Sequence, residues 1–501
     1  MKNYLFLILT KKSQKIISLF DLLINEDRWF RISELSNHLD LATRSTQRYV
    51  TDLFDIIHNY NELYGDTIEL LLTKNNGVKL IVTNSMMSFW NFIRYITIND
   101  EIFELSRSII FGQFKNPILF ASKKNLSHAQ VTSSLKKFNE FCTLSGVSFS
   151  NTDYEVVGDE KSIRIITYSM TWFLNRGNFW PKSHSEIDET KLSGFVNRLI
   201  EKYNFEIVSS KKRKLTYFIA TNLLRIRKKK SVTMQDEWID FFEDDLSGIV
   251  GMVTELYREY HIYNKAEIYF LSAYWQSETK LYMYQNLDDE VLHIHKKNQS
   301  TMYQITKTFY ELFSTKIIRI PPKTKDELFK DAFFAHLNCS ISKTNDYLNF
   351  DTILLQNNST IYPFLKDKLL ALIDELYDIT QNPVFFNKEV LLRVYMLIYS
   401  SIKSPTDYEP AIYIYLETDL PSTEEVCIKN YILDFFQSAF NLIFIDCKLS
   451  KKADIILSSI PLIEQDDHYL IKVMSDLKAP VSHRSMKNLE EKLFQISQNK
   501  S

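Results

Sequence analysis

The sequence predicts a mainly helical protein of several domains, with helices followed by hairpins near its N-terminus and a small α/β segment at its C-terminus. Its length of 501 residues exceeds what a single hydrophobic core usually supports, since domains commonly hold roughly 100 to 150 residues. Apolar residues recur at helical spacing along most of the chain, and only the C-terminal segment changes to the pattern of buried strands.

The charge balance restricts where the chain can bind nucleic acid. The 60 Lys and Arg residues face 62 Asp and Glu residues, which gives a net charge of −2. A nearly neutral chain does not attract nucleic acid over its whole surface. Any DNA-binding face must therefore be local.

Glycine and cysteine usage excludes several classes of protein. The chain has only 9 glycines, the last is Gly251, and none falls into the spacing of a Walker loop or a dinucleotide-binding fingerprint. Its 4 cysteines form no Cys-x-x-Cys pair, which argues against zinc knuckles, thioredoxin chemistry and a disulfide framework. No serine, cysteine or carboxylate pair forms a catalytic constellation. We therefore expect no enzyme activity, no cofactor and no metal site.

The N-terminus carries no targeting signal. The apolar stretch Tyr4–Leu9 is too short for the core of a signal peptide, and no run approaches the ~18 apolar residues of a membrane span. We expect a cytoplasmic protein that does not contact a membrane.

The first 84 residues show three helical patterns followed by a hairpin. An Asn-Gly pair ending at Gly77 lies between two apolar runs and is a strong hairpin-turn signal. The expected elements are helices over residues 16–24, from residue 34 after an N-cap at Ser33, and over residues 45–58, and strands over residues 67–72 and 78–82. This order predicts a winged helix-turn-helix domain over residues 1–84.

A similar unit follows in the sequence. Helical segments over residues 88–113 and 127–145 precede a strand-turn-strand pattern over residues 147–157, which Gly158 closes. We predict a second winged helix-turn-helix domain over residues 85–165.

The middle of the chain contains an internal repeat of amphipathic helices. Residues 218–228 line up with residues 333–343 and share Phe, Ala, Ile and Lys at equal offsets. Two related all-α bundles are therefore predicted, over residues 166–290 and 291–404.

The C-terminal segment predicts a small α/β domain over residues 408–501. Buried-strand patterns alternate there with amphipathic helices. The expected strands cover residues 411–416, 442–445 and 453–457, and the expected helices cover residues 423–440 and 485–497.

The strongest nucleic-acid signal lies just after the predicted helix-turn of the first unit. Arg44 and Arg48 are four residues apart with no acidic residue between Leu41 and Thr51, so both guanidinium groups share one helical face. Such a face donates to phosphates and to base edges in the major groove. A solvated charged face is the alternative, but the position between a helix-turn and a wing favours DNA recognition. The residues predicted to contact DNA are Arg44, Ser45, Thr46, Gln47, Arg48 and Tyr49.

Lysines extend the predicted DNA contacts to the wing and to the second unit. Residues 122–137 contain four lysines and no acidic residue. Lysines near an exposed hairpin or on a polar helix also serve solubility, and this alternative stays open. The lysines predicted to contact DNA are Lys74, Lys79, Lys123, Lys124, Lys136 and Lys137.

The most basic run of the chain lies in the first predicted bundle. Residues 202–230 contain ten Lys and Arg residues and one acidic residue, Glu206. This run could contact flanking DNA or an acidic partner, but the favoured interpretation is a solvated helix face.

His336 stands out among the ten histidines because it lies within the repeat. A neutral imidazole nitrogen is nucleophilic near physiological pH and can accept a phosphoryl group, whereas a lone histidine on an apolar helix face is more often a core residue. Cys339 lies three residues later, but two ligands do not make a metal site.

Together these five segments resemble the Mga/AtxA-like family of Gram-positive transcriptional regulators. Residues 46–49, Thr-Gln-Arg-Tyr, are similar to the family's first recognition helix, and residues 157–160, Val-Gly-Asp-Glu, to the end of its second helix-turn-helix. The helical repeat resembles two phosphotransferase-system regulation domains, known as PRD domains. Residues 408–501 resemble an enzyme IIB domain of that system.

The resemblance implies a virulence regulator that binds double-stranded promoter DNA and forms a homodimer through its regulation and IIB-like domains. It also implies control by the phosphocarrier protein of the sugar phosphotransferase system, with His336 as the phosphorylated residue, because Phe-Ala-His-Leu matches the family's histidine motif. The first copy departs from the motif, with Thr221 at the matching position and Tyr274 at a later one. The loop at residues 417–421 lacks the cysteine of an active IIB domain, so we expect dimer contacts there and no phosphoryl transfer.

Three other functions are compatible with parts of this pattern. An RNA-binding antiterminator can carry the same regulation domains, although such proteins open with a small β-rich domain. A phosphotransferase enzyme component would need the missing cysteine. A helical scaffold would bind protein partners without affinity for DNA.

Overall fold

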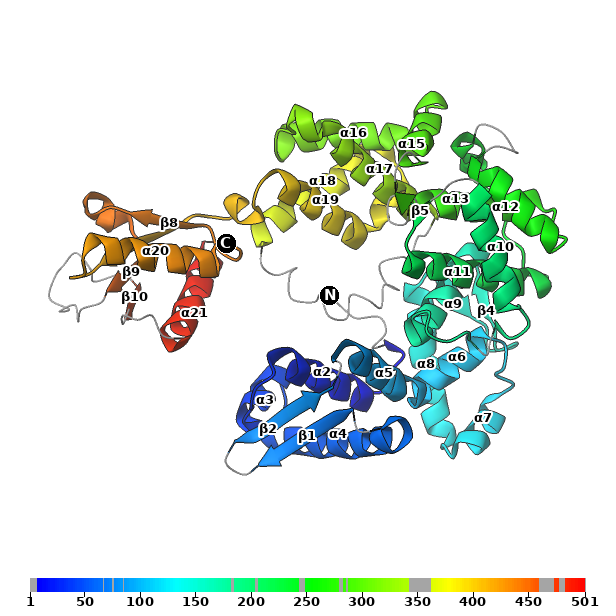
Figure 1. Cartoon of the computed structure of the whole chain (residues 1–501), viewed down its shortest axis with the longest axis horizontal. Helices are drawn as coiled ribbons and strands as arrows, with labels where there is room; N and C mark the ends of the chain where they lie inside the picture. The colour runs from blue at the N-terminus through cyan, green and yellow to red at the C-terminus, as the bar shows by residue number, and fades with distance from the viewer. Residues whose placement is uncertain are drawn as a thin grey trace. The chain divides into compact units, whose positions relative to one another are not determined.

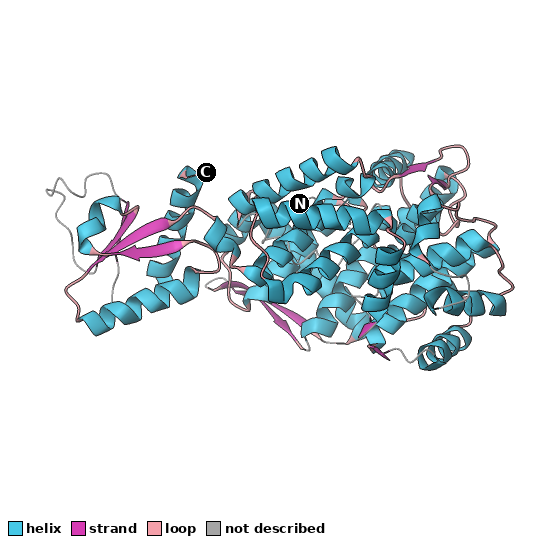
Figure 2. Ribbon diagram, turned by 90° about the horizontal axis from the view of Figure 1, so that it is seen from above, coloured by secondary structure: helices cyan, strands magenta, loops and turns pink. Residues whose placement is uncertain are grey.

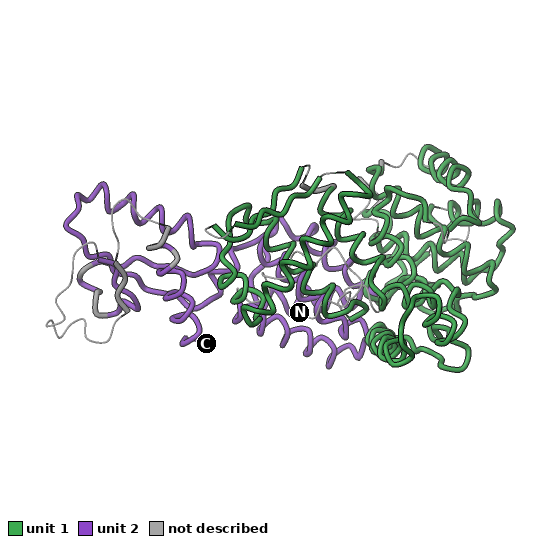
Figure 3. The backbone as a smooth tube through the Cα atoms, turned by 90° about the horizontal axis from the view of Figure 1, so that it is seen from below, with its two compact units in different colours: residues 1–301, 337–354 green, residues 302–336, 355–501 purple. Residues whose placement is uncertain are grey.

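The computed structural model describes residues 7–65, 67–73, 76–83, 85–181, 184–202, 206–242, 248–278, 283–284, 287–341, 362–458, 473–476 and 483–500. The chain divides into two compact units, one of residues 1–301 with 337–354 and the other of residues 302–336 with 355–501 (Figure 3). Helices dominate the described chain, as the sequence predicts, and the strands are short and few (Figure 2).

The first 82 residues form three helices and a hairpin, as predicted (Figure 1). Asp27 ends the first helix in the left-handed conformation, with φ of 36°. The prediction of an N-cap at Ser33 is wrong: the second helix begins at Ile32, two residues earlier than predicted, and its N-cap is Arg31. These elements are α2 (Lys11–Glu26), α3 (Ile32–Leu39), α4 (Thr43–Tyr64), β1 (Ile68–Thr73) and β2 (Gly77–Val82).

The hairpin forms at the predicted turn and is tied back to the helices. Leu70 pairs with Leu80 in the antiparallel ladder. The backbone of Phe30, between α2 and α3, exchanges hydrogen bonds of 2.8 and 2.9 Å with Val78 in β2. Gly77 permits this approach, because a Cβ at its position would lie 2.1 Å from the Phe30 carbonyl oxygen. The wing is thus fixed to the turn before α3.

The helix α5 (Ser85–Ile98) packs on the first helix-turn-helix unit and leads into the second helix-turn-helix unit. Phe92 lies 4.4 Å from Phe20 of α2 and 5.4 Å from Tyr60 of α4, measured between ring centroids. Asp100 then caps α6 by accepting from two backbone amides, and it also accepts from the Thr10 hydroxyl at 2.7 Å. Aromatic packing and one buried carboxylate therefore join the two N-terminal units.

The second unit repeats the order of helices followed by a hairpin. A Ser127–Gln130 capping box begins its third helix. Val147 pairs with Gly158 in the short antiparallel hairpin. The elements are α6 (Glu101–Ile110), α7 (Pro117–Lys124), α8 (His128–Leu144), β3 (Val147–Phe149) and β4 (Val156–Gly158).

Five helices follow, which we name the first helical bundle. Its first helix begins at Glu160, so it crosses the predicted boundary at residue 165. Arg164 is fully buried and donates to Glu267 at 2.6 and 2.9 Å and to Asn222 at 2.7 Å. The helices are α9 (Glu160–Asn175), α10 (Glu189–Lys202), α11 (Ser209–Arg227), α12 (Gly248–Glu259) and α13 (Lys265–Ser277).

Short elements complete the compact unit of residues 1–301 with 337–354. They are β5 (Glu206–Ile207), which pairs antiparallel with β6 (Met283–Tyr284), the 3-10 helix η2 (Asp236–Phe241), and α15 (Leu287–Lys297).

A second set of helices, which we name the second helical bundle, contains the other copy of the repeat. Its core includes Phe309, whose ring stacks on that of Tyr395 at 4.1 Å. The helices are α16 (Thr301–Lys316), α17 (Lys325–Ile341), α18 (Pro363–Thr380) and α19 (Lys388–Ile402), with 3-10 turns η3 (Pro322–Thr324), η6 (Pro383–Phe386) and η7 (Pro405–Tyr408).

The C-terminal segment forms a four-stranded sheet in which every neighbouring pair is parallel. The strand order is β10-β9-β7-β8, and apolar residues of β7, β9 and both helices form one core. The elements are β7 (Ile412–Glu417), α20 (Ser422–Phe436), β8 (Leu442–Ile445), η8 (Cys447–Lys452), β9 (Ile455–Ser458), β10 (Val473–Asp476) and α21 (His483–Asn499). The sequence predicts three of these strands and both helices, but not β10.

Candidate nucleic-acid interface

The N-terminal half of α4 presents a polar, basic surface. Arg44, Gln47 and Arg48 are exposed, and Ser45 and Tyr49 are half-buried. Within the described part of the chain, no carboxylate pairs with either arginine. The two guanidinium groups and the Gln47 amide can therefore donate to phosphate oxygens and base edges.

Thr46 is a correction to the predicted set of DNA contacts. Its side chain is fully buried, its hydroxyl lies 3.0 Å from that of Ser36 in α3, and it donates to the Ala42 carbonyl at 3.3 Å. The periodicity of the helix turns this residue toward α3 while its neighbours face solvent. Thr46 packs the helix-turn together and cannot reach DNA.

The first wing offers less basic surface than the sequence indicates. Lys74 lies outside the described residues. Lys79 pairs with Asp27 at 3.2 Å, an ion pair between the wing and the end of α2. Asp27 is well exposed, so this ion pair is weak. The contact of Lys79 with a DNA phosphate stays a prediction.

The second helix-turn-helix matches the first at an offset of 85 residues. Asp40 and Asn125 both end the preceding helix in the left-handed conformation, with φ of 51° and 55°. Thr46 and Val131 are the buried residues one turn into the third helix of each unit. The exposed positions of Gln47 and Arg48 correspond to Thr132 and Ser133 in α8, which are also exposed but uncharged. The sequence analysis did not single out these two residues, although the Ser127-x-x-Gln130 capping signal locates the helix start.

The four lysines predicted in the second unit face different surroundings. Lys123 and Lys136 are exposed, whereas Lys137 is half-buried. Lys124 lies 3.4 Å from Glu104, which also binds Arg107. Lys136 is therefore the clearest cation on the exposed face of α8.

The end of the most basic run contacts the second unit. Arg225 of α11 makes two hydrogen bonds of 2.6 and 2.7 Å to the carboxylate of Glu160, directly after β4. Lys230 lies 3.0 Å from Glu155, and the Lys228 ammonium donates to the Phe111 carbonyl. Lys228 and Lys230 therefore join the first helical bundle to the second winged unit, and Arg225 holds α11 against the start of α9.

The second wing differs in charge from the first. Its hairpin carries Asp153 and Glu155, both exposed, where the first wing carries lysines. Carboxylates near phosphates cost free energy, so this wing is suited to contact the basic end of α11 rather than the DNA backbone.

Comparisons with known proteins agree with this arrangement. The family model described as the Mga helix-turn-helix domain matches residues 85–170, from α5 into α9. Over 321 residues the chain is 22% identical to the capsule synthesis positive regulator AcpA of Bacillus anthracis, covering 61% of this chain and 62% of that protein. The resemblance to the Mga/AtxA-like regulators is confirmed.

Two further relatives of this chain come from the same organism. The anthrax toxin expression trans-acting positive regulator is 21% identical over 52% of this chain and 53% of its own length. The capsule synthesis positive regulator AcpB is 18% identical over 65% of this chain and 64% of its own length. The chain thus matches less than two thirds of each relative's length. All three are named as regulators, which supports the expectation that the Mga/AtxA-like chain is not an enzyme.

The second helical bundle buries His336, the predicted phosphoacceptor. The ring is fully buried; its Nδ1 lies 2.8 Å from the Thr306 hydroxyl and its Nε2 lies 2.7 Å from the Tyr395 hydroxyl. Thr306 in turn donates to the Met302 carbonyl, so Nδ1 donates to Thr306 and Nε2 accepts from Tyr395. Burial lowers the pKa of His336 to about 3. With both nitrogens bonded inside the core, His336 is a neutral packing residue.

The first bundle also pairs a histidine with a threonine, but there the threonine, Thr221, occupies the repeat position that His336 occupies in the second bundle. Thr221 is buried and its hydroxyl lies 3.1 Å from Nε2 of His184, whose pKa is lowered to about 4 by burial. A histidine and a threonine thus meet in the core of each bundle, with the histidine supplied by a different segment in each case.

The loop after β7 presents acidic groups. Thr418 donates to Glu425 at 2.7 Å, and the exposed residues nearby include Asp419 and Glu424. Carboxylates at the start of α20 repel a phosphoryl group. This geometry agrees with the expectation that the segment does not transfer phosphate.

The described residues hold no group of three metal-ligating side chains. Cys142 and Cys339 are buried and Cys427 is exposed, each as a thiol without a disulfide. Among the described helices, none is long and apolar enough to cross a membrane.

Proposed function

We propose that this chain is a cytoplasmic DNA-binding transcriptional regulator that activates gene expression from promoter DNA. The observation that carries the proposal is the exposed row of Arg44, Gln47 and Arg48 at the start of the third helix of a helix-turn-helix. The match to the Mga helix-turn-helix domain supports a second DNA-binding unit. The names of its relatives, which describe positive regulators of capsule synthesis and toxin expression, favour activation and a role in virulence.

The two helix-turn-helix units divide the work of recognition in this proposal. Helix α4 anchors the DNA through two arginines, and α8 reads base edges with Thr132 and Ser133 beside Lys136. A single module buries only about 600–1,000 Å² on DNA, so useful affinity requires both units or a dimer.

The two helical bundles supply regulation in this proposal, and they do so as phosphotransferase-system regulation domains. They would form a homodimer together with the IIB-like C-terminal domain, and the phosphocarrier protein would act on the bundles. His336 is not part of this proposal, because its ring nitrogens are bonded inside the core. The contacts of Lys230 with Glu155 and of Lys228 with the Phe111 carbonyl give the first bundle a direct route to the second DNA-binding unit.

A competition experiment tests the proposal. The full chain is bound to a fluorescent duplex from the region upstream of its own gene, and unlabelled duplex DNA or hairpin RNA is added. The expected result is displacement by duplex at a concentration at least about tenfold lower than by RNA. Equal or better displacement by hairpin RNA would favour an antiterminator, and no binding to any duplex would favour a scaffold.

A further inference from the structure

The two helix-turn-helix units follow each other without a flexible linker. Only Asn99 and Asp100 lie between the end of α5 and the start of α6. Phe92 of α5 packs on Phe20 and Tyr60 of the first helix-turn-helix unit, so the connecting helix belongs to that unit. Modules on a long flexible tether move independently, whereas a connection of two residues restricts their relative movement.

The Asp100 carboxylate binds the start of both units. Its Oδ1 accepts from the amides of Ile102 and Phe103, at 3.0 and 3.2 Å, in the first turn of α6. Its Oδ2 accepts from the Thr10 amide at 2.9 Å and from the Thr10 hydroxyl at 2.7 Å, and Thr10 is the N-cap of α2 in the first unit. Asp100 is only 3% exposed, so water competes little for these four hydrogen bonds. One carboxylate thus caps α6 and fastens it to the N-terminus of α2.

A second joint attaches α5 to the first helical bundle. The Arg176 guanidinium, at the end of α9, lies 3.8 Å from the centre of the Trp90 ring. The Arg94 guanidinium lies 5.2 Å from the centre of the Phe179 ring. Trp90 and Arg94 are four residues apart and share one face of α5. A cation over an aromatic face is attracted to it, most strongly over tryptophan, so these pairs hold α5 against the bundle.

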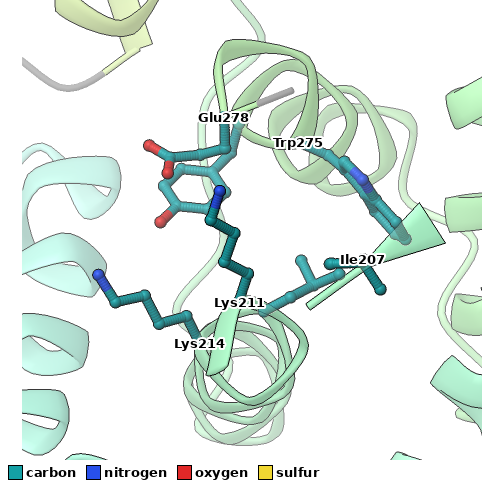
Figure 4. A pocket seen from close by; sticks show the side chains of 7 residues that line it. Ile207, Lys211, Lys214, Trp275 and Glu278 are labelled. Atoms are coloured by element: carbon teal, nitrogen blue, oxygen red, sulfur yellow. The ribbon is translucent and has the colours of Figure 1, made fainter. Parts of the chain in front are cut away.

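The first helical bundle connects this joint to the second helix-turn-helix unit. Arg164 of α9 is fully buried and donates at 2.6 and 2.9 Å to a carboxylate of α13. Lys211 of α11 extends toward Glu278 at the end of α13 (Figure 4). Helices packed and linked in this way transmit strain. Lys230, after α11, pairs with Glu155 of the second wing at 3.0 Å. The two units and the bundle therefore form a closed ring of contacts.

We propose that the two helix-turn-helix units are held as one rigid tandem, so that the chain recognises a duplex whose two sub-sites lie at one fixed spacing. Asp100 and Trp90 are the positioning residues of this tandem. The proposal rests on the DNA binding proposed above and adds the spacing to it. Linked modules gain affinity by binding together, and they lose this gain when their geometry forbids simultaneous contact. The spacing of the sub-sites is then part of recognition, as it is for half-sites in dimers.

Insertions into the bound duplex test the spacing. The full chain is footprinted on duplex from the region upstream of its own gene, and about 5 or 10 base pairs are inserted between the two protected segments; about 10 base pairs restore the same face of the DNA. We expect either insertion to weaken binding at least about tenfold. Binding that recovers with the longer insertion, or a footprint of one segment, would overturn the tandem and leave the proposed function intact. Absence of binding to any duplex would contradict both.

A distance measurement tests the tandem without DNA. Spin labels are attached at the exposed positions Asp55→Cys in α4 and Asn139→Cys in α8 of the full chain, after Cys427→Ser and Cys447→Ser. We expect double electron-electron resonance to give one narrow distribution of distances between the labels. A broad distribution would show that the two units move independently and would overturn the proposal.

Paired variants supply the control. Asp100→Asn/Trp90→Ala keeps an oxygen to cap α6, but it removes the acceptor for α2 and the stack on α9. We expect broader distances and a loss of less than about threefold on the longer insertion. The control Asp188→Asn/Tyr263→Ala changes an aspartate at the start of α10 and an exposed ring, and it should match wild type. Unfolding would weaken binding to the parent and the lengthened duplex alike, so the ratio of the two affinities reports the joint. An unchanged ratio in the first variant would contradict the positioning role.

Discussion

At the scale of single residues, the structure separates exposed side chains, which are free to contact DNA in the proposed function, from those that hold the helix-turn together. Arg44, Gln47 and Arg48 are exposed on α4, while Thr46 is buried against Ser36. The sequence places all of them in one short run, and only the packing of α3 against α4 shows which face is which. Helical spacing alone could have suggested this, since Thr46 and Val50 lie on the buried stripe.

Gly77 provides a stability test at this scale. Gly77→Ala should lower the free energy of unfolding by about 3 kcal/mol, because the new Cβ meets the Phe30 carbonyl and φ is 97°. The matched control is Gly65→Ala, where φ is 87° but no atom lies within 4 Å, and about 1 kcal/mol is expected. Denaturant unfolding of both variants measures the difference. Equal losses would show that the wing does not depend on its contact with Phe30.

His336 makes stability depend on pH. Its pKa in the folded protein, about 3, lies below the unfolded value near 6.5, so the unfolded state binds more protons between these values. Its contribution is therefore complete above about pH 6.5 and is lost as the pH falls. The difference in unfolding free energy between wild type and His336→Gln should decrease by about 1 kcal/mol from pH 6 to pH 5. Replacing the exposed His58 with Gln should leave the pH dependence of wild type unchanged.

At the scale of elements, the sequence predicts most helices and strands. It misses the features that depend on contacts between residues far apart in the chain. Local patterns locate the hairpin at Gly77 and the strand at β7, because turn chemistry and apolar alternation are properties of short segments. The strand β10 is missed because its four residues have no such pattern. The sequence also misses part of the role of the basic run at residues 202–230. Arg225 binds the carboxylate of Glu160, which lies 65 residues earlier in the chain, and no local pattern shows such a contact.

The contact between α11 and the second wing yields a further prediction. Arg225→Ala removes a half-buried, two-bond contact with Glu160 and should destabilise the first unit by about 1–3 kcal/mol. Lys230→Ala removes an exposed pair with Glu155 and should cost less than about 1 kcal/mol. Hydrogen exchange should also become faster in α9 and the second wing of Arg225→Ala, but not in α10. Unchanged exchange in α9 would show that Arg225 does not hold the start of α9, directly after the second wing, against α11.

At the scale of the whole molecule, a nearly neutral chain requires any nucleic-acid surface to be local, and we propose that it lies on the two helix-turn-helix units. The net charge of −2 leads to this expectation. Glu155 of the second wing and Lys230 after α11 form an ion pair, which reduces the basic surface that this region offers to nucleic acid. The bundles and the C-terminal sheet bury apolar cores, in keeping with their proposed role in regulation and assembly.

The salt dependence of DNA binding tests the central role of α4 most directly. Affinity for promoter duplex is measured against salt concentration for wild type, for Arg44→Ala/Arg48→Ala, and for the control Arg258→Ala/Arg319→Ala, which removes the same charge from exposed sites elsewhere. We predict that the first variant binds more weakly, with a salt slope shallower by ~1 to 2 units, and that the control matches wild type. Identical slopes for all three proteins would show that α4 does not contact the phosphate backbone.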